Sequence, residues 1–292
     1  MSFSQKIISV TISLANGNFG SGGNSSTITG LRTSAKINNT GGPQQSTMEL
    51  SIYGLSLSDV NQLTTFGSQY LQQYKNTISV SAGSDEDGMT TVFQGLIYSA
   101  YFDGQAEPQS CLRIQAQQGG YWAAKPIMPI SFQGPIAVST VAQQLAGTMG
   151  LTLENNGVTA MLSNPYFAGD AMSALQSLSE HAGFDYLIDK GTLAITAPGQ
   201  SRSGDPPLIS ADTGMVTYPL MVSNTIVARA LFNPAVKYNG NVTIQSDLTP
   251  ACGTFNVQHL EYDLEGNVPH GKWFMTVTCT VTGGSTPQGD GS

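Results

Sequence analysis

The sequence has few charged residues, few cysteines and no long apolar run, and each shortage excludes a class of protein. Charged residues make up 10% of the chain, against about 25% in ordinary globular domains. The cysteines Cys111, Cys252 and Cys279 are widely spaced and form no C-x-x-C pair. They predict reduced thiols rather than a disulfide framework or a zinc site. No apolar stretch approaches the ~18 residues that span a bilayer. Ile8–Leu14 alternates with period two, which predicts a strand rather than a signal peptide.

Positive charge is scarce as well. The chain carries 11 Lys and Arg against 19 Asp and Glu, for a net charge of −8 and a pI near 4.7. No segment gathers the basic residues, so the sequence excludes a surface that grips nucleic acid through many phosphate contacts. A diffuse acidic surface is instead compatible with nucleic acid that passes nearby without adhering, and equally with a charge that serves only solubility.

Glycine and uncharged polar residues take the place of charge. The 33 glycines, together with abundant Ser, Thr, Asn and Gln, suit many short strands joined by turns. We predict a mainly β protein with an α+β insertion, in five segments. These are a first β-barrel with one helix (1–118), a proline-rich connector (119–138), a small α+β module (139–200), a second β-barrel (201–282) and a flexible tail (283–292).

The first segment reads as strands with one inserted helix. The expected strands are Ile8–Leu14, Leu31–Asn38, Ser46–Tyr53, Thr77–Ala82, Thr91–Phe102 and Cys111–Gln117. Ser56–Asp59 fits a capping box that begins a helix. The apolar positions of that helix are Val60, Leu63, Tyr70, Leu71 and Tyr74, around Gly67. Gly95 predicts a β-bulge in the longest strand. About six strands around one helix favour a small barrel.

The connector and the module have different signatures. Prolines at 126, 129 and 135 predict an extended, non-helical connector. Ser139 and Thr140 predict the cap of one helix, whose Val141, Leu145 and Met149 share a face and which ends at Gly150. Asp170 predicts the cap of a second helix, with Ala171, Leu175, Leu178 and Ala182 on one face and its end at Gly183. Asp189–Gly191 predicts a three-residue hairpin loop.

The stretch from Ile209 to Pro234 contains the candidate interface. Thr225–Phe232 predicts a strand with Ile226, Ala228, Ala230 and Phe232 on one face. Its other face carries Thr225, Val227, Arg229 and Leu231. Arg229 is therefore the one cation on a face that otherwise carries Val227 and Leu231. Such a face is rarely left in water, which makes Arg229, Val227 and Leu231 candidate subunit-interface residues. Further strands are expected at Asn241–Gln245, Thr254–Leu260 and Lys272–Val281, with a turn at Leu264–Gly271.

No motif in the chain indicates chemistry. Glycines 17, 20, 22 and 23 match neither a dinucleotide fingerprint nor a P-loop. The acidic run Asp85–Asp87 lacks the glutamate of a calcium loop. His181, His259 and His270 are far apart, and Glu261 and Asp263, although on one face, lie near the end of an ordinary strand. The sequence therefore predicts no catalytic residue, no metal and no cofactor, and a protein that is not an enzyme.

The order of several segments resembles that of the baseplate hub proteins of contractile-tailed bacteriophages. This family is related to the hub portion of type VI secretion spike proteins. The segments are Leu57–Gly67, Thr91–Ile97, Gly134–Gly157, Asn164–Tyr166, Phe184–Ile195 and Thr217–Pro234 with Lys272–Phe274. The resemblance covers roughly residues 1–282 and rests on structural signatures, not on catalytic motifs.

The resemblance implies a mechanical role. Each chain would supply two tail-tube-like β-barrels that flank the α+β module, so a homotrimer would present six similar barrels in a ring around a channel. The barrels would join by strands across subunit borders. This ring would adapt a sixfold tail tube to a threefold spike. The implied partners are further copies of the chain, a tail tube or tube-initiator protein, a central spike protein and the C-terminus of a tape-measure protein. DNA would pass through the channel without specific binding, and no membrane would be involved. The protein would be made in the host cytoplasm and end in the virion.

Other classes remain open on the sequence alone. One is another tail-tube or tail-tip structural protein. Another is a carbohydrate-binding β-protein, which the aromatic content, including Trp122 and Trp273, permits. A third is a peptidoglycan hydrolase that uses two carboxylates.

Overall fold

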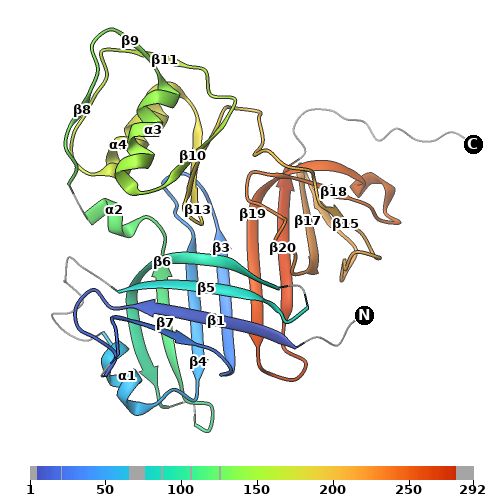
Figure 1. Ribbon diagram of the computed structural model, residues 1–292. Helices are drawn as coiled ribbons and strands as arrows, with labels where there is room; N and C mark the ends of the chain where they lie inside the picture. The colour runs from blue at the N-terminus through green and yellow to red at the C-terminus, as the bar shows by residue number, and fades with distance from the viewer. Residues whose placement is uncertain are drawn as a thin grey trace, which may run out of the picture.

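A computed structural model of the protein describes residues 5–20, 22–65, 76–86, 88–105, 107–124 and 126–280. The chain forms one large, mostly antiparallel sheet and a small α+β module beside it (Figure 1). The strands of the first half are β1 (Lys6–Ser13), β2 (Ser25–Ile28), β3 (Thr33–Asn39), β4 (Thr47–Tyr53), β5 (Thr77–Ser84), β6 (Gly88–Asp103) and β7 (Cys111–Gln117). Those of the second half are β15 (Leu208–Ile209), β16 (Leu220–Val222), β17 (Thr225–Leu231), β18 (Asn241–Ile244), β19 (Gly253–Gly266) and β20 (Trp273–Thr280).

The mainly β class with an α+β insertion is as predicted, but the sheet is continuous rather than divided. Its strand order runs β16-β17-β20-β19-β3-β4-β7-β6-β5-β1-β2, and β15 and β18 pair off this path. The two halves join where β19 pairs with β3, with Tyr262 opposite Ile37 and Leu264 opposite Ala35. One apolar core runs through both halves, from Ile8 to Cys279.

The first half curls back on itself without completing a ring of paired strands in the described part of the chain. The start of β1 approaches the end of β19, where the Asn267 amide donates to the Lys6 carbonyl at 3.2 Å. A Cβ added to Gly266 would lie 2.9 Å from the Ile8 nitrogen, so only glycine permits this approach. The strand pairing among the described residues is nevertheless an open path, with β16 at one end and β2 at the other.

The two halves share a strand order that the sequence does not reveal. In each half a first hairpin (β16–β17 or β3–β4) lies beside a second hairpin (β19–β20 or β6–β7) whose strands follow in reverse order. The third strand of each set also carries a bulge at the same place. An extra residue interrupts the pairing at Tyr98 in β6 against β7, and at Gln258 in β19 against β20. The large sheet thus contains two sets of four strands with the same order, β16-β17-β20-β19 and β3-β4-β7-β6.

The α+β module has its own core. Helices α3 (Val138–Met149) and α4 (Ala171–Ala182) pack with the strands β10 (Thr152–Asn156), β13 (Asp185–Asp189) and β14 (Thr192–Thr196). The short pairs β8 (Ile130–Ser131) with β12 (Tyr166–Phe167), and β9 (Pro135–Ala137) with β11 (Met161–Ser163), flank them. Asp170 caps α4 as predicted, since its side chain accepts from the Ser173 amide at 2.9 Å. Gly150 and Gly183 end the helices with φ of 71° and 65°.

Three local predictions in the module and connector are wrong. Helix α3 begins at least two residues earlier than expected, with Ala137 rather than Ser139 at the cap, so Ser139 and Thr140 lie in its first turn. The β13–β14 turn has two residues, because Asp189 pairs with Thr192 and leaves Lys190 and Gly191, both with positive φ, between the strands. The connector also contains a short helix, α2 (Gly120–Ala124), ahead of its first proline.

Two strand predictions are corrected too. Gly95 sits in regular pairing opposite Ile78, and the bulges of β6 lie at Val92 and Tyr98. Glycine is needed at 95 because a Cβ there would lie 2.7 Å from the Gln117 carbonyl oxygen. Strand β19 extends to Gly266, well beyond the expected end, because it is paired on both sides, with β20 and with β3.

The predicted helix after Ser56 is shorter than expected in the described residues. Helix α1 (Leu57–Leu63) begins at the predicted cap, where the Ser56 hydroxyl accepts from the Asp59 amide. Val60 and Leu63 are buried as predicted. Gly67, Tyr70, Leu71 and Tyr74 lie outside the described residues, as does the predicted tail 283–292.

Candidate assembly surface

Strand β17 has the two faces that its sequence predicts. Ile226, Ala228 and Ala230 are buried, whereas Arg229 and Leu231 on the other face are exposed. Val227 on that same face is half-buried. The three candidate interface residues, Val227, Arg229 and Leu231, therefore share one outward face.

The chain before β17 covers the outer edge of that strand. The Leu231 amide donates to the Gly214 carbonyl at 2.8 Å, and the Val216 amide donates to the Arg229 carbonyl at 2.9 Å. Further along, β16 pairs with β17 and places Leu220 opposite Val227. Strand β16 therefore forms the edge of the sheet at this end.

The edge strand β16 is apolar and exposed. Leu220 and Val222 are 59% and 57% exposed, and Met221 between them is 40% exposed. Val216 and Tyr218, just before the strand, are exposed as well. Edge strands of soluble proteins are usually protected by charge, proline or a cover, and an apolar edge such as this one is a surface suited to pairing with another strand.

Arg229 has an aromatic partner within the chain. Its guanidinium lies over the Phe274 ring, 4.6 Å from the ring centroid. Phe274 is opposite Leu231 in the β17–β20 pairing, so both side chains lie on the outward face. Among the described residues no carboxylate pairs with Arg229.

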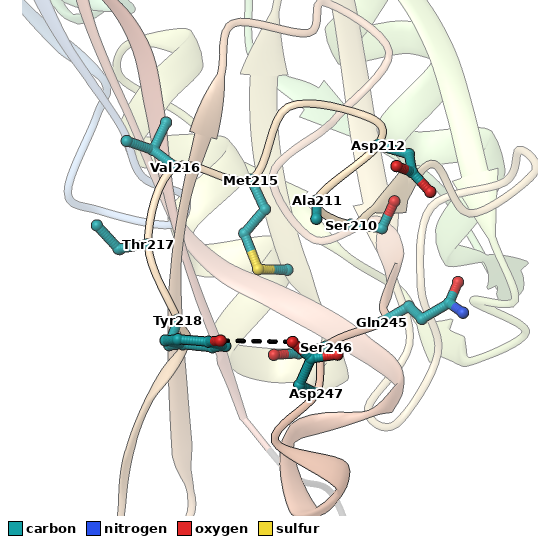
Figure 2. Close-up of a pocket in the computed structure, with 10 residues that line it drawn as sticks. All are labelled: Ser210, Ala211, Asp212, Met215, Val216, Thr217, Tyr218, Gln245, Ser246 and Asp247. Carbon is teal, nitrogen blue, oxygen red and sulfur yellow. Dashed lines mark hydrogen bonds between the residues drawn. The ribbon is translucent and has the colours of Figure 1, made fainter.

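A hollow of about 410 Å³ lies beside this edge (Figure 2). Its walls are the loop from Ser210 to Tyr218 and the end of β18 with Gln245–Asp247, and Figure 2 shows Met215 between them. The Tyr218 hydroxyl and an Asp247 carboxylate oxygen are 3.4 Å apart.

A buried arginine that sequence reasoning missed ties the module to the second half. Arg202 donates to Glu154 of β10 at 2.8 Å and to Asp189 at the end of β13 at 2.9 Å, and its side chain is 4% exposed. Its backbone amide donates to the Asn239 carbonyl of the second half at 2.8 Å. The one available signal was a lone arginine in a Gly-, Ser- and Pro-rich linker in a chain with so few charges.

The groups considered for chemistry take structural positions. Glu261 pairs with Lys36 at 3.1 Å, and Asp263 pairs with Lys272 at 3.2 Å. Within the described residues, no three His, Cys, Asp or Glu side chains gather closely enough to hold a metal ion. Asp87 of the acidic turn lies outside these residues. No described helix is both long enough and apolar enough to cross a membrane.

Comparison with known families decides what kind of protein this is. The model of the family Baseplate hub gp41 matches residues 7–279. The chain belongs to this family. Its members are structural baseplate hub and tail proteins, and the candidate assembly surface of this baseplate hub chain lies at the β16 edge of its open sheet. Among curated proteins no sequence matches the chain.

Solved structures with this fold include tail proteins and a component of a type VI secretion system. A tail protein from Neisseria meningitidis MC58 superposes with a TM-score of 0.62 at 10% identity, covering 94% of this hub chain and 96% of that protein. The 43 kDa tail protein of prophage MuSo2 from Shewanella oneidensis gives a TM-score of 0.59 at 8% identity, with 95% and 96% covered. The E. coli c3393 protein, a component of the type VI secretion system, gives 0.53 at 5% identity, with 87% and 73% covered. At these identities the likeness concerns the fold.

Proposed function

We propose that three copies of this hub chain form a ring that adapts the sixfold tail tube to the threefold central spike and leaves a channel for DNA ejection. The observation that carries the proposal is the repeated strand order of the two halves, joined edge to edge by β19 and β3. A trimer of such chains presents six similar units, as the tube requires, and keeps threefold symmetry for the spike. Each half then acts as one tail-tube-like unit.

The outward face of the large sheet has the composition that a DNA channel needs. Because directly opposed residues share a face, the strand register defines a row from Arg229 through Thr276, Glu261, Asn38 and Thr47 to Gln117. The next row runs from Leu231 through Phe274, Asp263, Lys36 and Glu49 to Gln115. Polar side chains fill the middle of both rows, and the apolar ones gather at the β17 end.

Two of the cations on this face, Lys36 and Arg113, are paired with carboxylates. Lys36 is paired with Glu261, lies opposite Glu49 and also feels the charge of Asp263. Its pKa is raised above the usual value, mainly by the hydrogen bond to Glu261. Arg113 is paired with Asp103 at 2.9 Å. Neutralised cations make poor phosphate contacts, which supports a channel through which DNA slides.

The apolar end of the face supports a border between copies. Val227, Arg229 and Leu231 lie one strand in from the exposed edge β16, and we propose that they lie beside the border with a neighbouring copy. Arg229, which rests on Phe274, would pair with a group of that copy. The tube or tube-initiator protein, the central spike and the tape-measure C-terminus would contact the two ends of the ring. The protein would act without catalysis, in the tail baseplate of the virion.

The mass of the purified protein and its image along the ring axis test this function. We expect a trimer by light scattering, and an axial view in electron micrographs with six similar lobes around an open centre. A stable monomer at high concentration, both alone and with spike protein, would contradict the proposal. A ring whose lobes do not number six would contradict it as well.

A further inference from the structure

The large sheet has a second exposed apolar edge, far along the chain from β16. The first part of β6, up to Leu96, pairs with β5, whereas the last part, from Tyr101 to Asp103, pairs with β7 alone among the described strands. Tyr101 and Phe102, in this last part of β6, are 45% and 46% exposed. The two edges, β16 and the end of β6, are the outer strands of the repeated four-strand sets.

The joint inside the chain shows how these edges fit. The third strand of the second set, β19, pairs antiparallel with the first strand of the first set, β3. In the repeat, β6 corresponds to β19 and β16 corresponds to β3. A neighbouring copy that continues the repeat would therefore pair its β16 with β6 of this chain, in the way that β3 pairs with β19.

The repeat also fixes the register. The matching bulges at Tyr98 and Gln258 align Phe102 with Tyr262. The first strands of the two sets, β3 and β16, are aligned by their hairpin partners. Ile37 of β3 pairs with Met48 of β4, and Met221 of β16 pairs in the same way with Ile226 of β17, so Ile37 corresponds to Met221. The two alignments agree with each other, because the pairings of β4 with β7 and of β17 with β20, which connect them, contain no register shift.

Within the chain, Tyr262 is opposite Ile37. We propose that copies of this chain join through β6 and β16 with Phe102 opposite Met221, Tyr101 opposite Val222 and Asp103 opposite Leu220. This inference rests on the proposed trimer and names its border. Phe102 and Met221 both lie on the core face of the sheet. Ala100, two residues before Phe102, and Ile226, opposite Met221, share that face and are both buried.

The joint covers the apolar side chains at both edges. It buries Tyr101 and Phe102 of one copy against Leu220, Met221 and Val222 of the next, all of them exposed in the single chain. The joint begins at Tyr101, because Thr65 already bonds the amide and carbonyl of Ala100. Since β6 and β16 are different surfaces, the contact is head-to-tail and closes into a ring rather than a two-fold dimer.

Disulfide trapping tests the register. In the antiparallel joint, the backbone N–H and C=O groups of Phe102 would exchange hydrogen bonds with those of Met221. Tyr101 and Val222 would then form a non-hydrogen-bonded pair, whose Cα atoms lie ~4.5 Å apart. That separation suits a disulfide. The variant is Tyr101→Cys/Val222→Cys, made with Cys252→Ser to remove the half-exposed native thiol. The matched control is Tyr101→Cys/Met221→Cys, because a slip of one residue moves the second thiol to the opposite face.

The expected result is a covalent trimer of the double variant on a non-reducing gel after mild oxidation, and little cross-linking of the control. A mixture of the two single variants should give covalent dimers and no larger species, because each chain then carries an introduced cysteine on only one of its two edges. A trimer by light scattering that does not cross-link above the control overturns the joint but leaves the proposed function standing. Cross-linking of Val222→Cys alone also overturns it, since that indicates a two-fold contact. Failure of the unmodified protein to form a trimer overturns the proposed function, and the joint with it.

Discussion

Replacement of Arg202 by methionine should detach the α+β module from the second half of the sheet. The side chain is 4% exposed and bonds Glu154 at 2.8 Å and Asp189 at 2.9 Å. Removal of one partner from a buried ionic network costs ~3–5 kcal/mol because the remaining charges stay desolvated. Glu154 and Asp189 are 23% and 20% exposed, so water reaches them in part. We therefore expect the lower end of that range, ~3 kcal/mol, or a melting temperature roughly 6–12 °C lower.

Thermal unfolding followed by circular dichroism measures this loss. The matched control is Arg113→Met, which removes an ion pair of similar length whose arginine is 45% exposed. An exposed pair contributes less than ~1 kcal/mol, so the control should melt close to the parent protein. If Arg202→Met melts no lower than Arg113→Met, the reasoning about the buried network is wrong.

The pH dependence of the same pair has a definite sign. Burial raises the pKa of Glu154, but the hydrogen bonds and the charge of Arg202 outweigh it, and the pKa lies below the usual value. A lowered carboxyl pKa stabilises the fold above its unfolded pKa of about 4.3, and the contribution is lost as the pH falls through the folded value. The gap in stability between the parent and Arg202→Met should therefore narrow below about pH 4.

Three further substitutions or labelling experiments have clear expectations. Arg229→Glu should weaken the trimer and its docking to tube protein, as measured by light scattering and co-sedimentation; an unchanged trimer would remove Arg229 from the border. Gly95→Ala should cost ~1–3 kcal/mol in urea unfolding, because its Cβ meets the Gln117 carbonyl at 2.7 Å. Gly147→Ala in α3, which meets nothing within 4 Å, should not destabilise. Cys252 should react first with a thiol reagent, because Cys111 and Cys279 are buried and burial raises the pKa of Cys279 to about 12; rapid labelling of Cys279 would contradict the buried core.

Local patterns in the sequence predict the features that depend on neighbours in the chain. The alternation in β17 gives its buried and exposed faces, and Asp170 marks the start of α4, because strand faces and helix caps are set within a few residues. The same reasoning ended β19 too early. Its last part carries Glu261 and Asp263, which read as a solvated end, yet these carboxylates are paired with lysines and the strand is held on both sides.

Features that depend on distant segments were beyond the sequence. The candidate residues Val227, Arg229 and Leu231 could be grouped because they lie on one strand. Tyr101, more than a hundred residues away, could not be linked to Val222 without the strand order and the two bulges. Gly95 was misread for the same reason, since the Gln117 carbonyl that excludes a side chain there belongs to another strand.

The pairing of β19 with β3 inside a single chain has a thermodynamic consequence for the proposed ring. Each association of free molecules costs an estimated ~4–15 kcal/mol in translational and rotational freedom. A ring of six separate units incurs that cost at every joint except the closing one. In a ring of three such chains, every second joint is already formed when the chain folds. The effective concentration of one half next to the other is that of a tethered pair and does not fall with dilution. The proposed ring should therefore assemble at lower protein concentrations than the tail tube, and should remain intact when the subunits of that tube dissociate.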